Sequence, residues 1–195
     1  MLIECNHRLP RIANHNNWAT LDLCSKHVIL YTSVQEEPFE DAAVAALQSA
    51  SKAGIPFICS SGNDGLDISK PGNQRYPCEY AKTIDGVICV AATVIKEMEL
   101  LEISNYAPYI NAAAPGYAFS TDLNGKYVAR AGASCSAAMV AGVVTMMKSV
   151  SKEPLSVQAI NSIIKETSTP GIERKGVQMD FGRLDALAAV KRVLG

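Results

Sequence analysis

The chain has 195 residues and a formal net charge of −1, with 48% hydrophobic and 19% charged residues. This length is typical of one domain with a sizeable core, and the composition is that of a compact globular protein. The near-neutral charge gives no indication of a nucleic-acid or anionic-membrane partner. The apolar runs are too short to span a bilayer, and the first residues lack the basic-then-apolar order of a signal peptide. We therefore expect a single domain over residues 1–195.

The first half of the chain alternates between strand-like and helix-like patterns. Residues 1–20 are polar and show no regular period, so we expect an irregular segment there, with a helical end near Trp18. The unbroken apolar run 27–31 predicts a buried strand, and the alanine-rich run 40–53, which precedes a glycine, predicts a helix. Residues 55–60 predict the next strand. A strand, helix and strand within about 35 residues is typical of a unit with parallel strands.

The second half continues the same alternation. Residues 86–93 and 109–116 predict two more strands, and Asn124-Gly125 predicts a hairpin between the arms 117–121 and 126–130. Three apolar periodic stretches predict helices within residues 131–150, 155–168 and 182–194. This order predicts an α/β fold, a mostly parallel sheet with helices on both faces.

Six cysteines, at positions 5, 24, 59, 78, 89 and 135, include no Cys-x-x-Cys pair and no histidine at zinc spacing. We therefore expect no metal site. Cys59 and Cys89 lie inside apolar strand runs and are interpreted as small buried hydrophobic residues rather than disulfide partners. Cys5, Cys24 and Cys78 could pair in an exported protein, and the sequence leaves their connectivity open.

Two polar segments are candidate functional sites. The loop 60–65, Ser-Ser-Gly-Asn-Asp-Gly, follows a predicted strand, and ligands of open α/β sheets bind at the carboxyl ends of strands. Ser134 lies among small residues where an apolar helix begins, and the free N–H groups of a helix start favour a substrate oxyanion or a bound anion. The structural alternatives are a helix cap for Ser134 and an ordinary turn residue for Asn63.

Several segments, in order, resemble the subtilisin-like serine peptidases. GASCSAAMVAG at 132–142 resembles the nucleophile motif G-T-S-M-A-S/T-P-H-V-A/S-G, and SSGNDG at 60–65 resembles the oxyanion loop A-A/S-G-N-E/D-G. Tyr-Pro at 76–77 before the run 86–93, Ala-Pro-Gly at 114–116 and Gly-Arg-Leu-Asp-Ala at 182–186 resemble further stretches of the family. The resemblance extends from about His27 to the carboxyl terminus, which leaves 1–26 as a poorly matched segment.

The resemblance implies a subtilisin-like fold, without the first strands of the family, and hydrolysis of peptide or protein substrates. It makes Ser134 the nucleophile and Asn63 the side-chain donor of the oxyanion hole, with the Ser134 N–H as second donor. Ser60, Ser61 and Gly62 would line the pocket for the residue before the scissile bond. The resemblance implies no cofactor other than calcium, which the family often binds, and a secreted or endomembrane location, although this chain shows no signal peptide.

The chain departs from the family where a general base and its orienting carboxylate are expected. Both precede the oxyanion asparagine in the family, yet none of the 62 residues before Asn63 matches the D-S/T-G or H-G-T-H motif. We interpret His7, His15 and His27 as loop or sheet residues. One interpretation is the carboxyl-terminal two-thirds of an endopeptidase domain, whose partner is a missing N-terminal segment or propeptide. The alternative is a non-catalytic relative that binds peptides or proteins.

The substrate-binding positions also depart from the family. The substrate-pairing strand end S-x-G of the family is Thr32-Ser33-Val34 here, without the glycine that lets a peptide backbone approach. In the nucleophile motif, Cys135 occupies the position where the family has a methionine, and Ala138-Met139 occupies the position of Pro-His. An anion-binding α/β domain outside the family is a third reading, but the chain lacks the glycine-rich phosphate motifs. On the first two readings, we expect the chain alone not to hydrolyse peptides at an enzyme-like rate.

Overall fold

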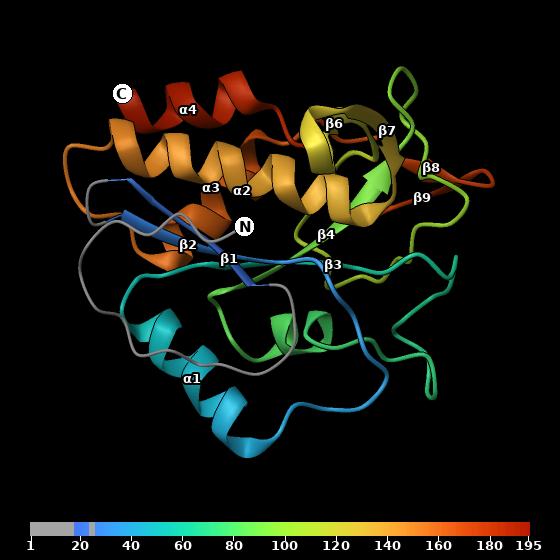
Figure 1. Ribbon diagram of the computed structural model, residues 1–195, viewed down its shortest axis with the longest axis horizontal. Coiled ribbons are helices and arrows are strands. Elements are labelled where there is room, and N and C mark those ends of the chain that lie inside the picture. The colour runs from blue at the N-terminus through green and yellow to red at the C-terminus, as the bar shows by residue number, and fades with distance from the viewer. Residues whose placement is uncertain (1–17, 24–25) are drawn as a thin grey trace.

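The computed structural model describes the backbone of residues 18–23 and 26–195, with side chains from residue 27 onward except at position 124. Residues 1–17 and 24–25, and with them Cys5, His7, His15 and Cys24, lie outside the described residues. A five-stranded sheet runs through the molecule in the order β1-β2-β3-β4-β5 (Figure 1). Its strands are β1 (Trp18–Leu23), β2 (Lys26–Tyr31), β3 (Phe57–Ser60), β4 (Val87–Thr93) and β5 (Ala112–Pro115).

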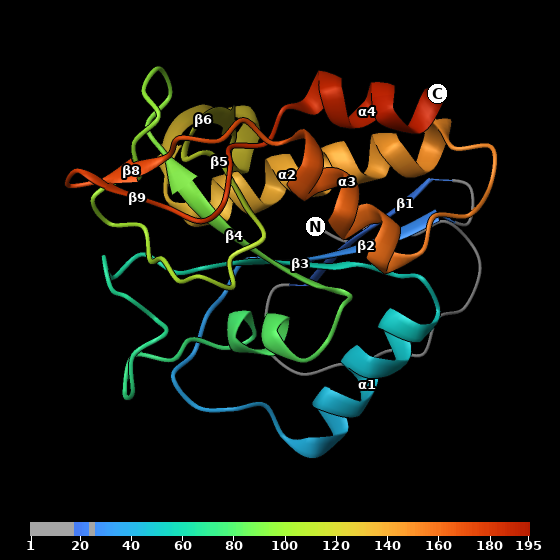
Figure 2. The ribbon, with the colours of Figure 1, turned by 180° about the vertical axis from the view of Figure 1, so that it is seen from behind.

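Helices cover both faces of this sheet, and β2 to β5 are parallel, as the sequence predicts. One face carries α1 (Asp41–Lys52) and the short 3₁₀ helix η1 (Cys78–Lys82). The other carries α2 (Ala133–Val150), α3 (Val157–Thr167) and α4 (Ala186–Leu194) (Figures 1 and 2). The molecule is therefore the expected α/β arrangement of three layers.

The central strands separate two apolar layers because their side chains alternate between the faces. Phe57 and Cys59 of β3 belong to the layer beneath α1 and η1, whereas Ile58 belongs to the layer beneath α2. In β4, Cys89 belongs to the layer beneath α1 and η1, and Val90 belongs to the layer beneath α2. Strands that are buried on both faces have continuous apolar sequences. The sequence pattern therefore identified β3 and β4.

β1 corrects the expectation for the start of the chain. Residues 18–23 form a strand antiparallel to β2, from the pair Trp18–Tyr31 to the pair Leu23–Lys26, so a helical end near Trp18 is wrong. The segment WATLDL alternates too briefly to indicate a strand by itself. Its backbone N–H and C=O groups find partners along β2, and this pairing, rather than local pattern, determines its conformation.

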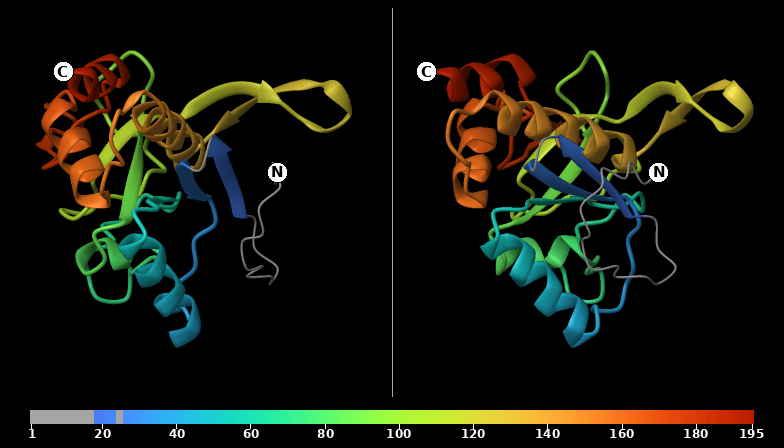
Figure 3. Two further views of the ribbon diagram at one scale, coloured as in Figure 1. Left: turned by 90° about the vertical axis from the view of Figure 1, so that its left-hand side faces the viewer. Right: turned by 60° about the vertical axis from the view of Figure 1, so that its left-hand side comes forward.

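Two hairpins and one short helix complete the backbone. The predicted hairpin consists of β6 (Tyr117–Thr121) and β7 (Tyr127–Ala131), joined through the 3₁₀ turn η2 (Leu123–Gly125). It projects from the body of the molecule (Figure 3). A second, smaller hairpin, β8 (Glu173–Arg174) and β9 (Val177–Gln178), has no counterpart among the sequence predictions.

α2 is the core helix against the sheet. In contrast to the expectation that no apolar run is long enough to span a bilayer, α2 could cross a membrane by length and composition alone, with a mean hydropathy of 1.4. Its residues Val140, Val144 and Met147 are fully buried against β2 to β5 and the neighbouring helices. Burial in the core therefore accounts for its apolar sequence.

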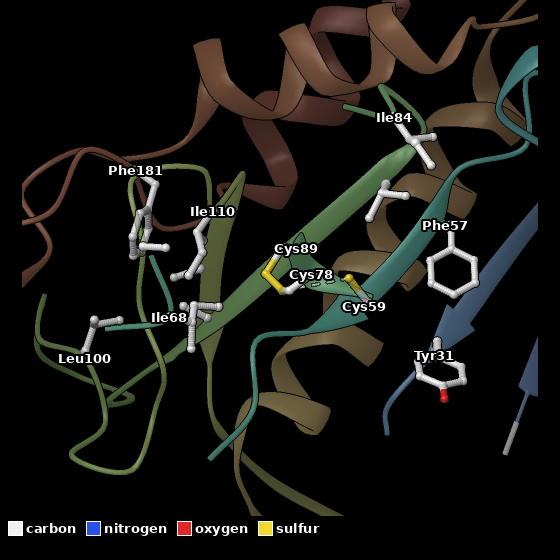
Figure 4. Packing of buried hydrophobic residues seen from close by; sticks show 14 of the residues in the cluster. Tyr31, Phe57, Cys59, Ile68, Cys78, Ile84, Cys89, Leu100, Ile110 and Phe181 are labelled. Atoms are coloured by element: carbon white, nitrogen blue, oxygen red, sulfur yellow. Dashed lines mark hydrogen bonds between the residues drawn. A yellow bond between two sulfur atoms is a disulfide. The ribbon is translucent and has the colours of Figure 1, made fainter. Parts of the chain in front are cut away.

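The cysteines of the core only partly follow the expectation. Cys59 is a free, buried thiol, as predicted, but Cys89 forms a disulfide with Cys78, with the two Cα atoms 5.0 Å apart. The interpretation of Cys89 as an unpaired hydrophobic residue is therefore wrong. The pairing brings η1 against β4, and no local sequence pattern indicates that contact (Figure 4).

Candidate active site

Ser134 lies in the first turn of α2, beside the carboxyl end of β2. Its hydroxyl donates a hydrogen bond to the carbonyl oxygen of Thr32, at 3.2 Å, and its side chain is half-buried. Thr32 directly follows β2, so this contact places the helix start at the edge of the sheet where parallel strands end. Ligands of open α/β sheets bind at this edge.

Asn63 is joined to the same helix start by its side chain. The Ala133 N–H donates to Oδ1 of Asn63 at 2.8 Å, which links two segments 70 residues apart in the sequence. Gly132 allows this approach because its φ is +132° and a Cβ there would lie 2.9 Å from Oδ1. The two motifs that the sequence singled out therefore meet at one point.

This arrangement orients two hydrogen-bond donors. Because Oδ1 of Asn63 accepts from Ala133, the amide Nδ2 remains as a donor, and no described group accepts a hydrogen bond from it. The Ser134 N–H belongs to the first turn of α2, where the earliest N–H groups lack the carbonyl partner of a full helical turn. A pair of fixed donors beside a serine hydroxyl can stabilise the negative oxygen of an acyl-transfer intermediate.

Asn105 holds the loop that carries Asn63, and the sequence analysis did not identify it. Its buried side chain accepts from the N–H groups of Asp64 and Leu66, at 3.0 and 2.9 Å, and donates to the Ser61 carbonyl at 2.9 Å. A Cβ at Gly62 would lie 2.5 Å from the Asn105 amide nitrogen, so only glycine fits there. The one available signal was a polar Ser-Asn pair at 104–105 directly before the aromatic and apolar run 106–110.

Asp64 and Arg75 form a charged contact beside this loop. The Arg75 guanidinium lies 2.9 Å from the Asp64 carboxylate and 3.4 Å from that of Glu36, and it is almost fully buried. The hydrogen bond from Asn105, then the hydrogen bond and charge of Arg75, hold the pKa of Asp64 below its usual value, while partial burial acts in the opposite direction. The contact links the loop 60–65 to Glu36, in the segment after β2.

Arg174 fixes the other side of the loop. Its guanidinium donates to four carbonyl oxygens, lies over the Tyr106 ring at 4.6 Å, and thereby ties β8 to the loops around residues 65 and 102. The four acceptors are Gly65, Leu101, Glu102 and Ser104. The geometry of Asn63 thus depends on residues from four separate parts of the chain.

Ser60, Ser61 and Gly62 lie together at the end of β3, and all three are buried. The Ser60 hydroxyl accepts from the Gly62 N–H, and the Ser61 hydroxyl donates to the Asn105 carbonyl. Val34 comes from the opposite segment, and its Cγ2 lies 3.4 Å from the point that a Gly62 Cβ would occupy. The hydroxyl groups of both serines therefore hold the main chain of the loop through hydrogen bonds. A methyl group of Val34 packs beside this loop.

No described side chain acts as a base toward Ser134, whose hydroxyl bonds only to a main-chain carbonyl among the described residues. His27 lies in β2, five residues before Thr32, which corresponds to about 16 Å along a strand. This separation places His27 far from the serine. A cavity of about 470 Å³ opens between α1 and α3, beside Lys52, Asp85 and Gln158, and Ser134 does not line it.

Solved structures of subtilisin-like proteases share this fold. A structure of the subtilase cytotoxin SubAB matches 87% of the chain with a TM-score of 0.70 and 22% identity, and the chain covers 59% of it. A protease from Pseudoalteromonas arctica matches 83% of the chain with a TM-score of 0.67 and 24% identity, and the chain covers 49% of it. These likenesses show the fold.

Sequence relatives are proteases of the same kind. The major intracellular serine protease of Bacillus subtilis is 32% identical over 109 residues, which are 55% of this chain and 33% of that protein. Subtilisin-like protease 1 of Plasmodium berghei is 26% identical over 92% of this chain and 32% of its own length. The chain thus spans about a third of each of these two relatives. The sequence profile of the Subtilase family matches residues 11–183, a match that begins upstream of His27, and the chain belongs to the Subtilase family.

Proposed function

We propose that the chain carries the nucleophile and oxyanion hole of a subtilisin-like serine endopeptidase, with Ser134 as nucleophile and Asn63 as side-chain donor. The hydrogen bond from the Ala133 N–H to Asn63 Oδ1 carries this proposal, because it brings the two motifs together. Ser134 would attack the scissile carbonyl and form an acyl-enzyme. The Asn63 amide and the Ser134 N–H would hold the oxygen that becomes negative.

Hydrolysis at an enzyme-like rate also needs a base to take the Ser134 proton. No described residue lies in that position, so we propose that the base and its orienting carboxylate are absent from this chain. In subtilisin, a member of the same family, removing the catalytic histidine lowers turnover by about 10⁶, a value we adopt from that enzyme. The chain by itself is therefore a poor hydrolase. A missing N-terminal segment would supply the base. With that base in place, the substrates are peptides or proteins.

A non-catalytic role in peptide or protein binding is the second candidate. Two observations favour it: the Ser134 hydroxyl is engaged by the Thr32 carbonyl, and Val34 packs at the strand end where the family has a glycine. An extended peptide would have to pair with main chain beside this valine. Under this alternative, Ser134 has no covalent chemistry in any form of the protein.

A fluorophosphonate probe separates the two candidates. The recombinant 195-residue chain is expected to label slowly, whereas the protein isolated from its source is expected to label rapidly on the peptide that contains Ser134. The intact mass and N-terminal sequence of the isolated protein identify any further segment. Ser134→Ala should abolish labelling, and Ser149→Ala, at an exposed serine of the same helix, should leave it unchanged.

Each result decides between the candidates. Rapid, Ser134-dependent labelling of the 195-residue chain would show that a base is present after all. Failure of the isolated protein to label at saturating probe would exclude the endopeptidase and leave the binding role.

A further inference from the structure

Three sulfur atoms gather in the core, from three separate elements. Cys59 lies in β3, Cys78 in η1 and Cys89 in β4, and their Sγ atoms all lie within 4.8 Å of one another (Figure 4). All three side chains are fully buried. Cys59 and Cys78 are separated by 19 residues, and Cys78 and Cys89 by 11, so no spacing motif reveals the cluster.

The spacing of these sulfurs suits a thiolate-bound metal ion. With zinc–sulfur bonds of about 2.3 Å, sulfurs in a tetrahedral site lie about 3.8 Å apart. The Sγ atoms of Cys59 and Cys78 are 3.9 Å apart. All three Sγ atoms lie within 4.8 Å of one another, so reduction of the Cys78–Cys89 bond leaves three thiols gathered around one point.

The surroundings favour a soft cation over a hard one. The cluster lies among apolar side chains, including Phe57, Ile68 and Ile110, and thiolates bind zinc and similar ions in preference to calcium or magnesium. Two main-chain oxygens adjoin the sulfurs and are neighbours for a fourth ligand position: that of Ser60, 3.5 Å from Cys78 Sγ, and that of Ile88, 3.6 Å from Cys59 Sγ. Three thiolates with Zn²⁺ carry a net charge of −1, a smaller buried charge than with a monovalent ion.

We propose that Cys59, Cys78 and Cys89 form a zinc site when the Cys78–Cys89 disulfide is reduced. A dithiol supplies two electrons and two protons, the Sγ–Sγ bond breaks, and the dithiol becomes its own disulfide. Zn²⁺ then displaces the three thiol protons and forms three zinc–sulfur bonds. The disulfide and the zinc site are alternative states of the same sulfurs, one oxidised and one reduced.

The cluster packs on the face of the sheet opposite to α2, whose first turn carries Ser134, and it does not depend on the chemistry of the candidate active site. Cys59 directly precedes Ser60, so the cluster fixes the end of β3 from which the oxyanion loop begins. Each thiol must lose its proton to bind Zn²⁺, so binding is expected to strengthen as pH rises.

Cobalt absorbance tests the proposal without any peptidase assay. The chain is reduced with a phosphine, freed of reductant under argon and titrated with Co²⁺. We expect one equivalent to bind with a near-ultraviolet sulfur-to-cobalt band that Zn²⁺ abolishes. Cys59→Ser should lose the band while retaining the disulfide after oxidation, and Cys135→Ser, at a free cysteine outside the cluster, should keep it.

The oxidised chain is the control that needs no substitution. It has the same sequence and should show less than one-tenth of the cobalt absorbance of the reduced chain. In addition, Zn²⁺ should raise the melting temperature of the reduced chain only. Equal absorbance in the oxidised chain, or an unchanged band in Cys59→Ser, would place the ion on other cysteines and overturn the proposal. A native disulfide that resists reduction would overturn it as well.

Discussion

Asn105 stabilises the loop 60–65 through several hydrogen bonds of one buried side chain. Replacing it with alanine leaves the N–H groups of Asp64 and Leu66 and the Ser61 carbonyl without that partner. Each buried group without a partner costs about 1–3 kcal/mol. Some will find water, so we expect Asn105→Ala to lower the free energy of unfolding by about 2–4 kcal/mol, measured by urea denaturation.

A surface amide provides the comparison for this loss. Gln158 is exposed and donates a single side-chain hydrogen bond to Asp85. Gln158→Ala should change the free energy of unfolding by less than about 0.5 kcal/mol. Equal effects of the two substitutions would mean that Asn105 does not hold the loop.

Asp64 makes stability depend on pH in the acidic range. Its pKa in the folded chain lies below the ordinary value of 3.8, so the charged form contributes stability above that value. This contribution is lost as the pH falls through the lowered pKa. We expect Asp64→Asn to lower stability at pH 7 and to flatten its decline below about pH 4. Urea midpoints at several pH values measure the difference.

Asp41→Asn controls for the removal of one carboxylate, because Asp41 is exposed at the start of α1. Its stability profile should follow that of the unsubstituted chain. A parallel decline in Asp64→Asn and the unsubstituted chain would show that the contact with Asn105 and Arg75 does not favour the charged carboxylate.

At the scale of single residues, the sequence indicated the candidate groups Ser134 and Asn63 but not the residues that hold their segments in place. Ser134 and Asn63 lie in motifs with small neighbours, and the structure joins their segments through Ala133. Asn105 and Arg174 act through contacts with distant carbonyl and N–H groups. Such contacts arise only when the chain has folded, so a linear pattern cannot show them.

The start of α2 depends on one glycine, and the middle of α2 contains another that is dispensable. At Gly132, φ is +132° and a Cβ would meet the Asn63 amide, whereas at Gly142 a Cβ would meet nothing within 4 Å. Gly132→Ala should therefore destabilise the chain by about 1–3 kcal/mol. Gly142→Ala should stabilise it by about 0.5–1 kcal/mol, because alanine is the better helix former.

Thermal or urea unfolding of the two variants measures this contrast within one helix. Gly132→Ala should also move the amide resonance of Asn63 in an NMR spectrum, and Gly142→Ala should not. Stabilisation by both substitutions would mean that the start of α2 does not need the glycine conformation.

At the scale of elements, long or buried segments were predictable and short paired ones were not. The strands 27–31 and 86–93 and the three helices of the second half lie where the apolar patterns place them. β1, β8 and β9 were missed, because each depends on pairing with a partner strand. The disulfide of Cys78 with Cys89 was missed for the same reason, since it joins two elements across the core.

At the scale of the whole molecule, the β6–β7 hairpin presents an aromatic surface to solvent. Phe119 and Tyr127 are 75% and 62% exposed, and their rings stack with centroids 5.8 Å apart. A two-stranded ribbon with most of both faces in water is marginally stable by itself. Because exposed apolar surface favours association, we expect the hairpin to make the isolated chain self-associate and unfold without a sharp transition.

Light scattering after size-exclusion chromatography measures this association over a range of concentrations. Joint replacement of Phe119 and Tyr127 with serine should reduce the mean mass and the binding of a hydrophobic dye, because it removes the stacked rings. Joint replacement of Leu187 and Leu194, which are exposed on α4, should have a smaller effect, since they lie outside the hairpin. A monomer that melts cooperatively and reversibly at all concentrations would show that the hairpin needs no covering partner.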